Sequence, residues 1–198
     1  MKKLVLASQS PRRKEILKQV GLTFEIQPSA IHEHISSHST VQDSIEELAL
    51  RKAKDVADKV QGDAIVLGAD TIVLLDGKIL GKPRSREDAT SMLRALSGKT
   101  HSVLTGIGLI DTGTGRHLKG HQRTHVTMKP YGMKEILEYI DSGECWDKAG
   151  AYGIQGLGAL LVQEIRGDYF NVVGLPVGLL DEMLKELDYF ILVGSGGQ

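Results

Sequence analysis

The chain has 198 residues, of which 41% are hydrophobic and 25% charged, the balance of a water-soluble globular protein with one substantial core. Its 24 Lys and Arg against 25 Asp and Glu leave a net charge of -1, which argues against nucleic acid as a general partner, because such binding needs clustered basic charge. The single cysteine, Cys145, excludes an intrachain disulfide and favours a reducing compartment. No apolar run is long enough to span a membrane, and the first one stops at Ala7, so we expect a cytoplasmic protein.

The first third of the chain predicts strands that alternate with helices. The apolar run 4–7 suits a buried strand, and Pro11 fits the first position of a helix for which Ser10 offers an N-cap hydroxyl. A strand at 23–26 and a polar loop at 27–39 follow. Apolar residues at helical spacing then predict a long helix over 43–60.

The rest of the chain adds hairpins to this alternation. Two strands, 64–68 and 71–75, are predicted on either side of Asp70, and Asp76 with Gly77 is a strong signal for a tight hairpin. Later elements are predicted as a helix from Ser85 to Leu96, paired strands at 101–111 and 116–128, a helix at 131–140, a glycine-rich loop at 143–158, a strand at 160–165 and a helix at 176–187. The fold class is therefore α/β, or mixed α+β, with a mixed central sheet flanked by helices.

The turn between the first strand and the first helix carries the chemistry of an anion site. A helix N-terminus has unpaired backbone N–H groups and a partial positive charge, so it attracts phosphate. Ser8 and Ser10 add hydroxyl donors, while Arg12 and Arg13 add guanidinium forks that match phosphate oxygens. The pattern by itself fits equally well a solvated basic pair on an ordinary capped helix.

Three further residues have the right chemistry for a phosphate or metal site. Asp70 follows an apolar strand, where a carboxylate can face a ligand, hold a metal or activate water, although many such residues only end the strand. Lys82 lies between Gly81 and Pro83, and Lys52 lies on the long helix. Either lysine can reach a phosphate, but surface lysines of this kind are more often simply solvated.

Seven segments together resemble the Maf family of nucleotide pyrophosphatases, which is related in fold to the inosine triphosphate pyrophosphatases. They run in family order and are residues 6–13 (LASQSPRR), 51–53 (RKA), 68–73 (GADTIV), 80–83 (LGKP), 98–106 (GKTHSVLTG), 151–156 (AYGIQG) and 171–176 (NVVGLP). The resemblance implies one domain over residues 1–190 with two lobes and a cleft around an elongated sheet. We expect the tail, 191–198, to be disordered.

The resemblance also implies a reaction: cleavage of a nucleoside triphosphate between the α- and β-phosphates, with release of pyrophosphate. Asp70 matches the family's proton acceptor, and the phosphate-holding positions are Ser8, Ser10, Arg13, Lys52 and Lys82. Glu33 matches an acidic position that shares a divalent metal, Mg²⁺ or Mn²⁺, with Asp70, although His32 stands before it where the family often has Asp. Oxygen-rich sites of this kind suit either metal.

The resemblance also implies a substrate, through three positions. Arg12, Thr71 and Gln155 match the subgroup that resembles dTTP and UTP pyrophosphatases, and the Gln155 amide suits the edge of a pyrimidine base. The family is also associated with septum formation, so the alternative function is a nucleotide- or nucleic-acid-binding regulator of cell division without obligatory catalysis. A homodimer is compatible with the resemblance, and the sequence itself does not specify one.

Overall fold

The computed structural model describes residues 2–31 and 39–192. Its strands are β1 (Lys3–Leu6), β2 (Phe24–Ile26), β3 (Ala64–Leu75), β4 (Lys78–Leu80), β5 (Thr100–Asp111), β6 (His117–Met128) and β7 (Val162–Arg166). Its α-helices are α1 (Pro11–Gln19), α2 (Val41–Ala57), α3 (Arg86–Leu96), α4 (Met133–Asp141), α5 (Tyr169–Val173) and α6 (Val177–Glu186). Two short 3₁₀ helices, η1 (Ala149–Ala151) and η2 (Gly156–Leu161), lie between α4 and β7. None of the helices in these described ranges is long and apolar enough to cross a membrane.

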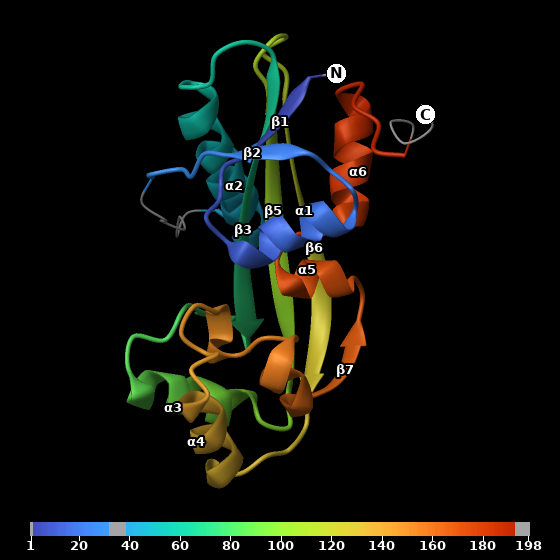
Figure 1. Ribbon diagram of the computed structural model, residues 1–198. Coiled ribbons are helices and arrows are strands. Elements are labelled where there is room, and N and C mark those ends of the chain that lie inside the picture. Colours follow the sequence, from blue (N-terminus) through green and yellow to red (C-terminus); the bar gives the residue numbers. More distant parts are fainter. Residues whose placement is uncertain (1, 32–38, 193–198) are drawn as a thin grey trace. The chain divides into compact units, whose positions relative to one another are not determined.

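The chain divides into two compact units. Unit 1 comprises residues 1–70, 105–122 and 174–198, and unit 2 comprises residues 71–104 and 123–173. The strands β3, β5 and β6 each contribute one part to each unit (Figure 1). The predicted mixed α/β class is confirmed, because the sheet order β2-β1-β3-β5-β6-β7 combines parallel pairs around β1 with antiparallel pairs at β4 and β7.

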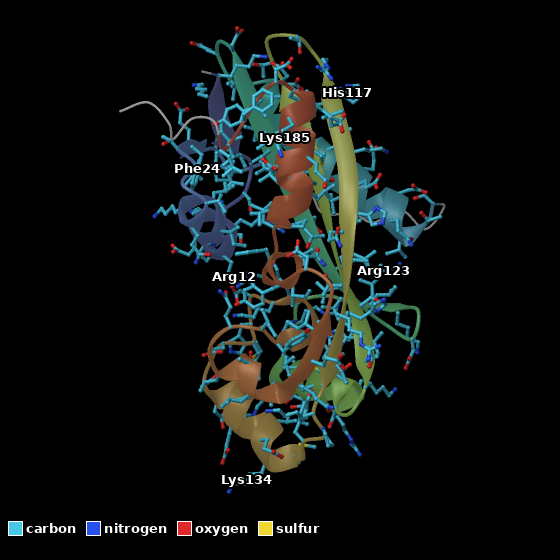
Figure 2. The ribbon with its side chains drawn as sticks, turned by 90° about the vertical axis from the view of Figure 1, so that its right-hand side faces the viewer. Arg12, Phe24, His117, Arg123, Lys134 and Lys185 are labelled. Atoms are coloured by element: carbon cyan, nitrogen blue, oxygen red, sulfur yellow. The ribbon has the colours of Figure 1, made fainter. Side chains whose placement is uncertain are left out.

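Unit 1 is a sheet with helices on both of its sides. The short strand β1 is parallel to β2 on one edge and to β3 on the other, and its four residues are matched with residues 64–67 of β3. The helices α2 and α6 lie on opposite sides of this part of the sheet (Figures 1 and 2). On the α6 side, Gly120 of β6 faces Leu179 and Met183 at ordinary packing distance.

Three glycines let the backbone of α2 lie directly against the sheet. A Cβ atom on Gly68 of β3 would lie 2.1 Å from the carbonyl oxygen of Ala49. A Cβ on Gly106 of β5 would lie 2.4 Å from the carbonyl oxygen of Ile45, and one on Gly108 would be equally close to α2. We call these three residues the glycine seam. The seam determines how closely α2 approaches the sheet and therefore where the polar side chains of α2 lie.

The predicted break at Asp70 is wrong, because β3 continues without interruption from Ala64 to Leu75. The prediction depended on Gly68 and Asp70, which are poor strand formers. Gly68 is accommodated because α2 packs on it, and Asp76 and Gly77 make the hairpin turn later, at φ values of 48° and 77°. Since the register with β1 ends at Leu67, Asp70 lies beyond the last β1 partner rather than at a strand end.

Unit 2 has a core of its own between its strands and the helix pair α3 and α4, which lie side by side (Figure 1). The predicted cap of α3 is confirmed, because Ser85 Oγ accepts from the Asp88 backbone N–H at 3.1 Å. The helix α5 was not predicted. It carries Asn171, which is fully buried and donates to the Val103 carbonyl at 3.0 Å and to Thr124 Oγ1 at 2.9 Å.

The glycine seam generates a stability prediction. Gly68→Ala places a methyl group against α2 backbone that has no space for it, so we expect a loss of about 1–3 kcal/mol in the free energy of unfolding, measured by urea denaturation. Gly120→Ala is the control, because its nearest neighbour is a methionine sulfur at 3.6 Å. Equal stability of the two variants would contradict the close approach.

Candidate functional site

The turn before α1 is held by its own serine and arginine side chains. Ser8 Oγ accepts from the Ser10 backbone N–H at 3.2 Å and from Arg13 Nη1 at 3.1 Å. Arg13 Nε donates to the carbonyl oxygen of Gly174 at 2.8 Å, and the arginine is only 8% exposed. For Arg13 the alternative of a solvated surface cation is therefore wrong. The guanidinium is a fixed, buried group.

Ser10 occupies the N-cap position of α1, as predicted, but its side chain makes no capping hydrogen bond. Ser8 Oγ accepts the hydrogen bond from the Ser10 backbone N–H instead. The first turn of α1 contains no acidic residue, and Arg12 stands half-buried at that end of the helix (Figure 2). The helix dipole and its uncompensated first turn make this end electropositive, as an anion site requires.

A buried ion pair joins α2 to β3. The Nζ atom of Lys52 donates to Oδ1 of Asp70, and the two side chains are 9% and 13% exposed. Lys52 is therefore not the solvated surface charge that it could have been by sequence alone. Burial of two charges away from water is costly, so an ion pair in this position is weak evidence for a gain in stability.

The turn before α1 and the Lys52–Asp70 ion pair lie at the same end of the unit 1 sheet, beyond the paired residues of β1 and β3. The strands β1 and β3 are parallel, with Leu6 matched to Leu67. Ser8 comes two residues after Leu6, and Asp70 comes three residues after Leu67. The carboxyl ends of parallel strands are where α/β sheets bind ligands. The structure thus brings together the predicted residues Ser8, Ser10, Arg12 and Arg13 with Lys52 and Asp70, on one end of unit 1.

The remaining described candidates belong to unit 2. Thr71 follows Asp70 on β3 and is half-buried, and Gln155 is exposed at the N-cap of η2. Lys82 is exposed and lines a hollow of about 380 Å³ next to α3. The loops that carry Lys82 and Gln155 are tied together, because the Gly150 backbone N–H donates to the Gly81 carbonyl at 2.9 Å.

Of the two residues predicted to hold the metal, Glu33 and Asp70, the structure describes only Asp70. Glu33 lies outside the described residues. Within the ranges 2–31 and 39–192, no three His, Cys, Asp or Glu side chains gather as a ready-made metal cage. Of the two predicted metal-binding carboxylates, the described one, that of Asp70, lies at the electropositive end of the sheet. One carboxylate together with substrate phosphates is a donor set that Mg²⁺ accepts, so the residues present fit a metal brought in with a triphosphate.

Sequence reasoning missed the side chains that shape the loop before Gln155. His101 is 3% exposed, and its Nε2 shares a 2.6 Å hydrogen bond with the Tyr152 hydroxyl. The two rings meet edge to face, with centroids 5.2 Å apart. The segments that contain the two residues had both been singled out, but a partnership across 51 positions has no local signal.

Comparison with known proteins identifies the family. The model of the Maf-like protein family matches residues 3–187. The chain belongs to this family. It is 49% identical over 194 residues, covering 98% of this chain and 93% of the relative, to a dTTP/UTP pyrophosphatase of Caldanaerobacter subterraneus. A dTTP/UTP pyrophosphatase of Moorella thermoacetica is 52% identical over 184 residues, which are 93% of this chain and 94% of the relative.

A solved structure shows a weaker likeness. It is a HAM1 protein from Coxiella burnetii, with a TM-score of 0.48 and 19% identity over 67% of this chain and 76% of that one. The predicted family membership is thus confirmed by the family model and the relatives, independently of this structural match.

His101 generates a pH prediction. Burial lowers the pKa of His101 from 6.5 to about 4, so the ring is neutral in the folded protein, whereas the unfolded chain binds a proton near pH 6.5. As the pH falls from 6.5 to 4, protons bind the unfolded state first, and this group alone should remove about 3 kcal/mol from the free energy of unfolding. Urea denaturation from pH 7 to pH 4 measures this loss.

The comparison variant is His101→Gln, which has no titrating ring. We expect its free energy of unfolding to fall less steeply over the same pH range than that of the natural chain. Parallel pH profiles for the two proteins would show that His101 does not stay neutral in the fold.

Proposed function

We propose that this chain hydrolyses dTTP and UTP to the nucleoside monophosphate and pyrophosphate. The observation that carries the proposal is the buried Lys52–Asp70 pair, at the same sheet edge as the turn Ser8–Arg13. The names of the relatives, which are similar to this chain over nearly their whole length, support the choice of substrate.

In the proposed reaction a water molecule attacks the α-phosphorus, the bond to the α,β-bridging oxygen breaks, and pyrophosphate leaves. Asp70 accepts the proton of the attacking water, and Lys52 orients the carboxylate through its ion pair. Arg13 and the electropositive end of α1 stabilise the charge that develops on the phosphates, because both are fixed before the substrate arrives.

Other side chains have supporting parts in the proposal. Ser8, Ser10, Lys52 and Lys82 are proposed to hold phosphate oxygens, and Arg12, Thr71 and Gln155 to select the base. A divalent cation, Mg²⁺ or Mn²⁺, would be held by Asp70 and Glu33 and would supply charge neutralisation to the triphosphate.

Cys145 is fully buried as a free thiol, which fits our proposal of a cytoplasmic protein. A homodimer and a link to septum formation are parts of the same family-based proposal.

A nucleotide panel tests the function. The purified chain is incubated with dTTP, UTP, dCTP, GTP and ATP in the presence of Mg²⁺ or Mn²⁺, and nucleoside monophosphate and pyrophosphate are quantified. We expect dTTP and UTP to give both products. Release of orthophosphate from these two nucleotides, or no turnover of either, would contradict the proposal.

Asp70→Asn tests the proposed proton acceptor. The amide keeps the size of the side chain but cannot accept the proton, so we expect kcat to fall by about a hundredfold or more while nucleotide binding is largely retained. Asp58→Asn, at the exposed C-cap of α2, is the control. Undiminished kcat in Asp70→Asn would remove this residue from its role. Tight binding by the natural chain without turnover would favour the regulator hypothesis instead.

A further inference from the structure

The exposed residue Gln155 stands midway between two anchors that hold its backbone. Two residues before it, the Gly153 backbone N–H donates to the Tyr139 hydroxyl at 3.2 Å. Two residues after it, the Leu157 N–H donates to the Glu144 carboxylate at 3.0 and 3.2 Å. The Gly158 N–H points to the same carboxylate at 3.4 Å. The chain on either side of Gln155 is therefore held by side chains from the segment that precedes the loop.

Two glycines of this loop lie close to the anchors. Gly156 has a φ of +63°, and a Cβ on it would lie 2.7 Å from Glu144 Oε1. A Cβ on Gly158 would lie 2.1 Å from the Gly153 carbonyl oxygen and 2.8 Å from the Tyr139 hydroxyl. Only glycine allows the backbone to approach both anchors this closely. The composition of the loop is thus matched to the two anchoring side chains.

The anchors are themselves fixed. Tyr139 belongs to α4 and is only 5% exposed, so its hydroxyl has one position. Lys148 donates through Nζ to the backbone carbonyl oxygen of Glu144, and its aliphatic stem packs against Gly153, where a Cβ would lie 2.7 Å from Cε. Glu144 also suits its place by charge, since a carboxylate is stabilised where it accepts from the first N–H groups of a helical turn.

We infer that Glu144 and Tyr139 are positioning residues for base selection, because they fix the backbone on both sides of Gln155 and therefore the point from which its side chain extends. This inference rests on the proposed function. An amide that discriminates by hydrogen bonds is selective only if it is held, since a mobile one re-forms its bonds with the wrong base or with water. Neither positioning residue touches the substrate in this account.

Glu144→Ala tests the inference through selectivity. The quantity measured is the ratio of kcat/KM for UTP to kcat/KM for GTP. We expect this ratio to fall by about tenfold, mainly through a higher KM for UTP, because the backbone that carries the amide loses its fixed position while Lys52 and Asp70 are untouched. Glu135→Ala is the matched control: its carboxylate accepts from the Gly132 backbone N–H at 2.6 Å to cap α4, outside the loop. That variant should keep the ratio.

Tyr139→Phe provides a second variant that preserves the packed ring and removes only the hydroxyl oxygen. We expect a smaller shift of the ratio in the same direction. Tyr131→Phe is its control, because the Tyr131 hydroxyl donates to the Leu93 carbonyl at 3.0 Å in the same unit. Hydrogen exchange at residues 153–158 should accelerate in the Glu144 and Tyr139 variants and not in the controls.

A double-mutant cycle with Gln155→Ala separates positioning from general damage. If Glu144 acts through Gln155, Glu144→Ala has no further effect on the ratio once Gln155 is an alanine. Additive effects, an unchanged ratio in Glu144→Ala, or an equal loss on every nucleotide would overturn the inference. An unchanged ratio in Gln155→Ala would also overturn the inference, because Gln155 would then not select the base. The proposed function fails separately, if the natural chain does not turn over UTP and dTTP.

Discussion

The direct contact of the α2 backbone with the sheet is the constraint on which unit 1 depends. Gly68 on β3 and Gly106 and Gly108 on β5 have no side chains between the helix and the strands. The helix therefore sits deep enough for Lys52 to reach Asp70 on the strand beneath it. Side chains in place of the seam glycines would move α2, and with it Lys52, away from Asp70. The glycine seam is therefore part of the site although its residues have no functional groups.

In unit 2, too, glycines allow the backbone to lie close to neighbouring groups. There the apolar residues on either side of Gln155 are not buried, since Ile154 is half-buried and Leu157 is exposed, and glycines allow the chain to lie against polar side chains instead. Tyr139 accepts a hydrogen bond from one backbone amide of this chain segment, and Glu144 accepts from two. Tyr152, within the segment, shares a hydrogen bond with the ring of His101. In both units glycine provides close approach, and a small number of fixed polar groups convert that closeness into a defined geometry.

Local signals predicted local structure well. The proline that opens α1, the Asp76–Gly77 turn and the Ser85 cap of α3 were all found, because each depends on residues within one turn of chain. The mixed sheet followed from the order of these elements. The break at Asp70 was predicted wrongly, since strand continuity depends on the neighbouring strands and on α2 rather than on local propensity.

The candidate site was predicted as a set of residues but not as an arrangement. Ser8, Arg13, Lys52 and Asp70 were chosen from motifs, yet no pattern could show that Lys52 pairs with Asp70 across 18 positions. Nor could it show that Arg13 is tied to Gly174, 161 positions away. Contacts of this range exist only in the folded chain, and they distinguish buried, oriented charges from solvated ones.

In the proposed reaction the chain directs water to the α-phosphorus of a pyrimidine nucleoside triphosphate. Hydrolysis of UTP in water enriched in oxygen-18, followed by mass spectrometry of both products, tests it most directly. We expect the heavy oxygen to appear in the nucleoside monophosphate and not in the pyrophosphate. Label in the pyrophosphate, or label in released orthophosphate, would place the attack on another phosphorus and contradict it.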